Sequence, residues 1–136
     1  MDFVKSLAVA ASGLRAQAGR MRVISENIAN SNSTAKSPGG DPYRRRIPTF
    51  ASQLDRALDA RVVTVGRIQT DRSDFQSKYQ PGHPAADGRG YVKYPNVNSV
   101  IEMADMRDAQ RSYEANVNVI GATRRMIQRT LDILRG

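Results

Sequence analysis

Apolar side chains recur three and four residues apart through the last forty residues of the chain. No proline interrupts the pattern between Asn98 and Arg135, which predicts one long amphipathic helix. Its two lines of heptad core positions are Met103, Gln110, Val117, Arg124 and Leu131, and Met106, Tyr113, Ile120, Ile127 and Leu134. Such a seam is typical of a coiled coil. Ser99 and Glu102 form a predicted capping box at the start of the helix.

This predicted helix is too long for a compact chain of 136 residues. At 1.5 Å per residue it measures about 55 Å, whereas a globule of this size is less than roughly 40 Å across. We therefore expect the helix to project or to pack against other long helices. Gln110 and Arg124 interrupt its seam with polar groups, which either face solvent or set register and contact neighbouring subunits.

A second apolar seam lies at the N-terminus. Between residue 2 and about residue 30, large apolar side chains occupy every seventh position: Leu7, Leu14, Met21 and Ile28. Gly13 and Gly19 each weaken an isolated helix by about 1 kcal/mol relative to Ala, so this helix needs a partner. We expect the terminal helices to pair as an antiparallel coiled coil. A monomeric bundle is the alternative, but no third or fourth helix is visible to complete it.

The period of the pattern changes between the two helices. Residues 33–42 are rich in Ser, Gly and Pro, which predicts a linker loop. Four short extended segments follow, and we expect them to form one small sheet: 43–50, 61–68, 75–79 and 91–94. The stretch 50–60 fits either a helical turn or a hairpin arm.

The predicted fold class is therefore mainly α with a small β insertion. Residues 1–32 and 96–136 would form a terminal helical, coiled-coil domain. Residues 33–42 would link it to a small β-rich domain at 43–95.

Composition narrows the class of function. The chain has no Cys and no Trp, which excludes disulfides, thiolate metal sites and thiol catalysis. No apolar run predicts a membrane span or a cleaved signal peptide. Of the net charge of +8, residues 31–95 carry +5, whereas residues 1–30 and 96–136 carry +2 and +1. The long helices are thus nearly neutral, unlike helices that bind nucleic acid.

No catalytic, cofactor or metal site is predicted. His83 is the only histidine and lies in a Gly-Pro turn near Asp87, and one His with one Asp provides too few ligands or proton-transfer partners. Arg44, Arg45 and Arg46 are consecutive. Because alternate side chains of a strand point to opposite faces, these three cannot all grip one phosphate.

Motifs near both ends resemble those of the bacterial flagellar axial proteins, which form the rod and the hook. They read ASGLRAQ at 11–17, ISENIANSN at 24–32 and DAQRSYEAN at 108–116. Segments of the middle are similar to the proximal rod subunits: GGDPYRR at 39–45, PGHP at 81–84 and GYVKYPNVN at 90–98. A short Thr-Pro-Gly-Tyr junction of the wider family is replaced here by a longer loop at 33–43, which is itself similar to the proximal rod subunits. The resemblance covers essentially the whole chain.

The resemblance implies a structural subunit without enzymatic activity. It would polymerise into the tubular rod, which transmits motor torque and encloses the export channel. The implied partners are copies of itself, other rod subunits, the adaptor and membrane-ring proteins of the basal body, and the type III export apparatus in transit. The implied place is the periplasmic rod, reached without a cleaved signal peptide. No nucleic acid, membrane span or cofactor is expected.

We assign the helix seam and subunit interface to thirteen residues: Leu7, Leu14, Met21, Ile28, Met103, Met106, Gln110, Tyr113, Val117, Ile120, Ile127, Leu131 and Leu134. One alternative is a different rod subunit. A second is a module that binds nucleic acid or an anionic surface through six arginines: Arg44, Arg45, Arg46, Arg56, Arg61 and Arg67. Binding of that kind would fall linearly with the logarithm of salt concentration.

Overall fold

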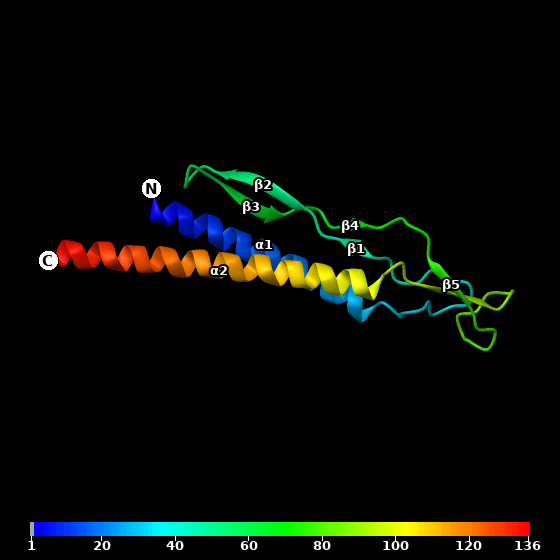
Figure 1. Ribbon diagram of the computed structural model, residues 1–136. Coiled ribbons are helices and arrows are strands. Elements are labelled where there is room, and N and C mark those ends of the chain that lie inside the picture. Colours follow the sequence, from blue (N-terminus) through cyan, green and yellow to red (C-terminus); the bar gives the residue numbers. More distant parts are fainter. Residues whose placement is uncertain (1) are drawn as a thin grey trace. The chain divides into compact units, whose positions relative to one another are not determined.

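Two long helices flank a β-rich segment in the computed structural model, which describes residues 2–136 (Figure 1). Helix α1 spans Phe3–Ala29 and helix α2 spans Ser99–Arg135. Both lie within one residue of the ranges expected from the apolar periodicity. The predicted class, mainly helical with a small β insertion, is confirmed in these terms.

The strands form three separate antiparallel pairs within the described residues. They are β1 (Arg46–Ile47) with β4 (Gln69–Thr70), β2 (Phe50–Asp55) with β3 (Ala60–Val65), and β5 (Gln76–Tyr79) with β6 (Tyr91–Tyr94). The prediction of one small sheet is therefore wrong. A larger sheet needs a continuous apolar face to pack against a core, and nearly every residue of β2, β4 and β5 is exposed.

Residues 50–60, which fitted either a helical turn or a hairpin arm by sequence, form a hairpin arm. Strand β2 pairs with β3 from Phe50 opposite Val65 to Asp55 opposite Ala60. The carboxylate of Asp55 accepts a hydrogen bond from the Ala57 N–H at 2.9 Å within the connecting turn. Asp59 completes that turn with a positive φ of 48°, a conformation that Asp tolerates better than most residues.

The chain divides into two compact units, and each takes part of both helices. The first comprises Met1–Met21, Pro48–Arg67 and Arg107–Gly136, and the second comprises Arg22–Ile47 and Ile68–Met106. The division expected from the sequence, a helical domain and a β-rich domain, stays a prediction.

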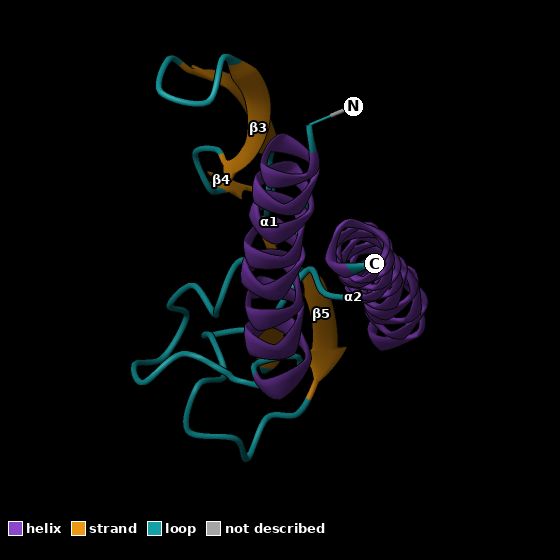
Figure 2. Ribbon diagram, turned by 90° about the vertical axis from the view of Figure 1, so that its left-hand side faces the viewer, coloured by secondary structure: helices purple, strands orange, loops and turns teal. Residues whose placement is uncertain are grey.

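Small residues of α1 allow close contacts in the first unit, where the hairpin of β2 and β3 lies beside α1 (Figure 2). The Val63 N–H donates to Ser12 Oγ at 3.1 Å. A Cβ on Gly19 would lie 2.9 Å from a methyl group of Val65, and a Cβ on Gly13 would lie 2.9 Å from the amide nitrogen of Asn116 in α2. The glycines that weaken α1 as an isolated helix therefore admit the hairpin and α2 at close range.

A small apolar core fills the second unit. Val23 and Ile24 from α1, Val92 from β6 and Val97 from the loop before α2 are each buried. A polar network that includes the buried Glu102 and Asn27 accompanies this core.

Candidate assembly interface

The seam residues predicted on α2 occupy two different environments. Met106, Tyr113, Ile120 and Ile127 are half-buried, although Leu134 at the end of the same line is 78% exposed. The other line is exposed along its whole length: Met103, Gln110, Val117, Arg124 and Leu131. The structure therefore does not bring the two predicted lines together against the rest of the chain.

A different line of α2 is buried. Each of its residues comes one position before a residue of the exposed line. Glu102 is 1% exposed, Ala109 is 0% exposed and Thr123 is 4% exposed, with Asn116 half-buried between them. Thr123 Oγ1 donates to the Val119 carbonyl at 2.8 Å, which satisfies the buried hydroxyl within its own helix. Sequence reasoning missed this line because small and polar side chains leave no trace in a hydropathy pattern.

The predicted seam of α1 is uniformly half-buried: Leu7, Leu14, Met21 and Ile28. The fully buried positions of α1 are different: Ala10, Ser12, Ala16, Val23, Ile24 and Asn27. Three small residues and three larger ones are thus fully buried, while the seam residues keep part of their apolar surface available.

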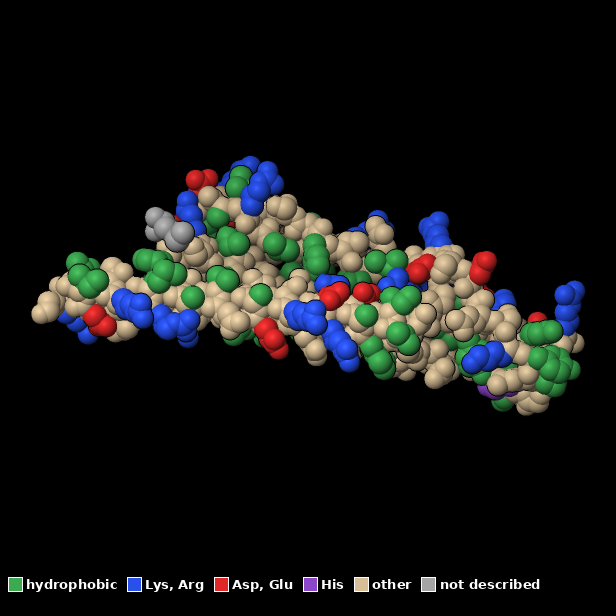
Figure 3. Space-filling view, viewed as in Figure 1, with side chains coloured by type: hydrophobic (Ala, Val, Ile, Leu, Met, Phe, Trp, Pro, Cys, Tyr) green, Lys and Arg blue, Asp and Glu red, His purple; other side chains and the backbone are tan. Residues whose placement is uncertain are grey.

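Helix α2 exposes an extended set of apolar side chains, visible as green groups along its length in Figure 3. Those at least 44% exposed are Val100, Ile101, Met103, Val117, Val119, Met126, Leu131, Ile133 and Leu134. Monomeric proteins rarely expose large contiguous apolar surface, and where they do it usually marks an interaction site. These exposed side chains lie on several sides of α2, and the line of Met103, Val117 and Leu131 among them is the candidate interface.

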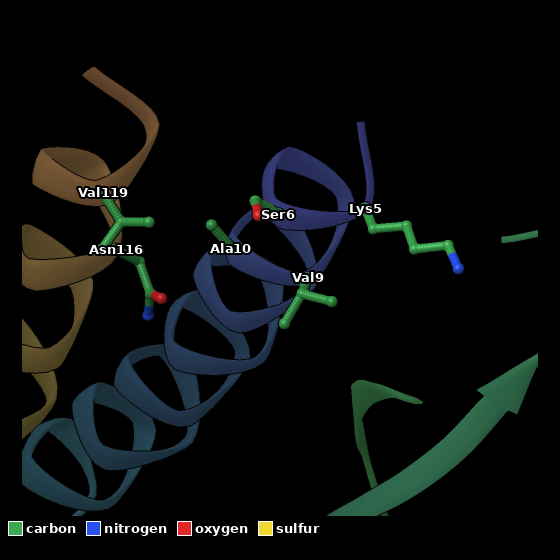
Figure 4. A pocket seen from close by; sticks show the side chains of 6 residues that line it. All are labelled: Lys5, Ser6, Val9, Ala10, Asn116 and Val119. Carbon is green, nitrogen blue, oxygen red and sulfur yellow. The ribbon is translucent and has the colours of Figure 1, made fainter. Parts of the chain in front are cut away.

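An open hollow of about 380 Å³ lies between the two helices in the first unit. Lys5, Ser6, Val9 and Ala10 line it from α1, and Asn116 and Val119 line it from α2 (Figure 4). Its lining is mostly apolar. A hollow of this shape can receive a side chain from a neighbouring molecule.

Asn98 caps α2 through its own side chain. Its Oδ1 accepts a hydrogen bond from the Val100 N–H at 3.1 Å, and its carbonyl accepts one from the Glu102 N–H at 3.0 Å. The predicted capping box of Ser99 and Glu102 is therefore wrong, because the cap lies one residue earlier and the Glu102 carboxylate is used elsewhere.

The Glu102 carboxylate is the centre of a buried polar network in the second unit. Arg45 Nε donates to Glu102 Oε1, and Asn27 Nδ2 donates to Glu102 Oε2 at 3.3 Å. The Arg45 guanidinium also lies 3.5 Å from Asp71 Oδ2 and 3.6 Å from Asp105 Oδ2. A largely buried arginine is thus surrounded by three carboxylates, so its charge is compensated inside the unit.

Two pKa shifts follow from this arrangement. Burial lowers the pKa of the Arg45 guanidinium, but the hydrogen bonds and charges of Glu102 and Asp71 outweigh burial, and the pKa is raised. The pKa of the Asp71 carboxyl is lowered, first by hydrogen bonds from the backbone and hydroxyl of Ser73 and then by Arg45. Both groups therefore stay charged at neutral pH.

Asn27 joins the end of α1 to the same network. Its Nδ2 donates to the Arg46 carbonyl at 2.8 Å, and its Oδ1 accepts from the Arg46 N–H at 2.9 Å and from the Tyr43 hydroxyl at 2.7 Å. Burial raises the pKa of Tyr43, which keeps this hydroxyl protonated as a donor. Asn96 Oδ1 accepts from the Arg45 N–H at 2.8 Å. Four residues from three of the quoted motifs therefore meet in one place. We call this network of Asn27, Tyr43, Arg45, Asp71, Asn96 and Glu102 the polar junction.

The three consecutive arginines point to different partners. Arg45 enters the polar junction, whereas the Arg44 guanidinium lies 4.1 Å from the centre of the Phe75 ring. Arg46 Nη1 lies 3.4 Å from Glu26 Oε2. The three side chains therefore form no common phosphate site.

His83 has a structural role in its turn, since its Nδ1 accepts a hydrogen bond from the Ala85 N–H at 3.0 Å. Across residues 2–136, no group of three or more His, Cys, Asp or Glu side chains is placed to hold a metal ion. Neither helix in that range is long and apolar enough to cross a membrane.

Comparisons with known proteins agree with the motifs at both ends. The family model described as flagella basal body rod protein matches residues 7–35, and that described as flagellar basal body rod FlgEFG protein C-terminal matches residues 89–133. These matches cover most of both helices. They define the chain as an axial protein of the flagellar rod class.

Individual relatives narrow this class. The chain is 53% identical to the flagellar basal-body rod protein FlgC of Agrobacterium fabrum, over 93% of this chain and 91% of the relative. It is 42% identical to FlgC of Borreliella burgdorferi over the whole of both chains, and 41% identical to FlgC of Bacillus subtilis over 98% and 99%. The chain belongs to the FlgC family of flagellar basal-body rod proteins, whose members are structural subunits and not enzymes.

Proposed function

We propose that this chain is a subunit of the proximal rod of the flagellar basal body, where it polymerises into a tube that transmits torque and encloses the export channel. One observation carries the proposal within this family. Met103, Val117 and Leu131 stand on one line of α2 and are each at least 44% exposed, so the chain leaves apolar surface for neighbouring subunits to cover.

In the assembled rod, the terminal helices pair as an antiparallel coiled coil. The helix segments of the first unit run in opposite directions (Figure 1). Gly13, which has no side chain, lies against Asn116. The half-buried line of Met106, Tyr113 and Ile120 then serves the pairing within one chain. The exposed line serves contacts between chains.

Contacts between chains are heterologous, because the exposed line of Met103, Val117 and Leu131 and the hollow lined by Val9 and Val119 are different surfaces. Repeated heterologous contacts that do not close into a ring generate a helical tube. The neighbours are copies of this chain, other rod subunits, the basal-body adaptor and the membrane ring. The chain passes the type III export apparatus in transit and resides in the periplasmic part of the rod.

The test is a charge placed on the exposed line. In a strain that lacks the native protein, Val117→Asp should abolish swimming in soft agar and remove the chain from purified basal bodies, because an unpaired carboxylate would be buried at the interface. Asn118→Asp is the matched control, since Asn118 is an exposed neighbour outside the apolar line. Normal incorporation of the Val117→Asp chain would overturn the assignment of this face.

A further inference from the structure

Helix α2 continues past the start of the helix beside it. A Cβ on Gly13 would lie 2.9 Å from the amide nitrogen of Asn116, so these residues are neighbours in the first unit. Helix α1 begins ten residues before Gly13, at Phe3. Because the two segments run in opposite directions, α2 passes that start ten residues after Asn116, at Met126. Residues 127–135 of α2 therefore extend about 14 Å beyond α1 at 1.5 Å per residue (Figure 1).

This end of α2 carries apolar side chains that the described residues leave uncovered. Ile127 is the last half-buried residue of the helix, and every residue at 128–136 is exposed. Leu131 is 44% exposed and Leu134 is 78% exposed. Because they lie three positions apart, these leucines share one side of the helix, and they continue both lines of the predicted seam. We call residues 128–135 the α2 tail.

The hollow between the two helices has the form of a hole for such side chains. Its lining residues lie three or four positions apart on each helix: Ser6 with Val9 and Ala10, and Asn116 with Val119 (Figure 4). In coiled coils, seam side chains enter holes formed by four residues of a facing helix. A cavity of about 150 Å³ can hold benzene, so a hollow of about 380 Å³ has room for two leucine side chains.

Charge does not oppose the entry of apolar side chains into the hollow. Lys5 is the charged residue of its lining, and Lys5 Nζ already lies 3.9 Å from Asp59 Oδ2. In the tail, the exposed Arg129 comes five residues before Leu134, which places it on the opposite side of the helix. The surfaces that would meet are therefore apolar.

The tail cannot fill the hollow of its own chain. Helix α2 is continuous from Val119 to Leu134, and these residues lie about 22 Å apart at 1.5 Å per residue. The occupant therefore comes from another molecule. A second copy of the chain supplies one tail for every hollow, and each copy can use both surfaces at once. Repeated contacts of this heterologous kind build an open helical assembly.

We propose that the α2 tail of one copy docks into the hollow of a second copy, with Leu131 and Leu134 filling the space between the two helices. Val9 and Val119 form the walls against which they pack. The proposal rests on the proposed function and deepens it by naming two surfaces of neighbouring subunits that meet. Leu131 also belongs to the exposed line, so this contact continues the candidate interface.

The experiment uses the absence of cysteine from the chain. The double variant Val9→Cys and Leu134→Cys replaces the native protein in motile cells, and purified basal bodies are treated with the oxidant copper phenanthroline. The two cysteines of one copy are too far apart for a disulfide, so each bond joins two copies. The expected product on a non-reducing gel is a ladder of dimers, trimers and larger oligomers, because every copy both provides a tail and receives one.

The control pair is Val9→Cys with Arg129→Cys. It should give at least about tenfold less oligomer, because Arg129 lies on the far side of the tail and disulfides require close Cα atoms. Leu134→Cys alone should give no dimer. The absence of a ladder from the test pair is the result expected if a different rod subunit fills the hollow. That result, an equal ladder from the control pair, or a dimer from Leu134→Cys alone would each overturn the proposal.

An exchange of side-chain size tests the contact without cysteines. Ser6→Leu fills the hollow and Leu134→Ala shortens the tail, so each variant should lose swimming in soft agar. The double variant Ser6→Leu and Leu134→Ala should regain swimming, since the larger lining side chain occupies the space that the smaller tail side chain leaves. A double variant that swims no better than either single variant would also overturn the proposal.

The two proposals fail in different ways. If the chain is present in purified basal bodies but the test pair gives no ladder, only the docking of the tail is overturned. If the native chain is absent from basal bodies altogether, its proposed place in the rod is overturned, and the docking of the tail falls with it.

Discussion

The two ends of α2 differ in what holds them. At its start, Asn98 caps the first turn and Glu102 is buried against Arg45. At its end, Ile133 and Leu134 are each 78% exposed. The same helix thus begins in a network that one chain satisfies alone and ends in a segment that one chain cannot cover.

This difference separates folding from assembly. Breaking the pair of Arg45 and Glu102 would leave a charge without its main partner, so we expect the polar junction to order the second unit in a single chain. Helical turns with exposed apolar side chains contribute little free energy to the folding of a single chain. They contribute much more to assembly, when a neighbouring subunit removes those side chains from water. We expect the junction to control stability and the far end of α2 to control polymerisation.

The largest expected effect is that of Glu102→Ala. Removing this carboxylate leaves Arg45 largely buried with the weaker partners Asp71 and Asp105, which should lower the free energy of opening of the second unit by about 3 kcal/mol. Hydrogen exchange of the amides at 22–47, measured by mass spectrometry on the purified chain, reports this free energy.

Glu114→Ala is the matched control, because Glu114 is exposed on the same helix and should change the opening free energy by less than about 0.5 kcal/mol. The double variant Arg45→Met and Glu102→Leu should be less destabilised than Glu102→Ala, since no uncompensated charge stays buried. Equal exchange rates in Glu102→Ala and the native chain would contradict a stabilising role of the junction.

A smaller effect is expected at the cap. Asn98→Ala removes the oxygen that accepts the Val100 N–H and should destabilise the first turn of α2 by about 1 kcal/mol. Ser99→Ala tests the capping box expected from the sequence and should have less than half that effect. Faster hydrogen exchange at residues 100–102 in the Ser99 variant than in the Asn98 variant would reverse this assignment.

The periodicity of the sequence predicted both helices but did not reveal the line of α2 that is most deeply buried in the single chain. Apolar spacing placed Met106, Tyr113 and Ile120 on one line of the seam, and these three residues are half-buried. It then placed Met103 and Val117 beside them, whereas Ala109 and Thr123 are the buried residues. Small and polar side chains let another part of the chain pack closely against α2, because they are short and can form hydrogen bonds. A hydropathy pattern records neither side-chain size nor hydrogen bonding.

The polar junction shows a second limit of sequence reasoning. The motifs drew attention to Asn27 and Arg45, but their common partner Glu102 lies 75 residues from Asn27. Nothing local in the sequence pairs residues so far apart, and Glu102 also satisfied the pattern of a capping box. The strand pairs were missed in the same way, because the short exposed strands β2 and β5 carry no apolar alternation that specifies a partner.

The smallest effect on the single chain, and a large one on assembly, is expected for Ile133→Ser at the far end of α2. The side chain is 78% exposed, so its replacement should change the opening free energy at 22–47 by less than about 0.5 kcal/mol. In the rod the same change leaves a hydroxyl where a neighbour covers apolar surface, and swimming should be strongly reduced. Thr130→Ser, an exposed polar change one turn earlier, should leave both properties intact. Ile133→Ser would therefore show the opposite pattern to Glu102→Ala, and normal swimming together with normal exchange would mean that the end of α2 is not an interface.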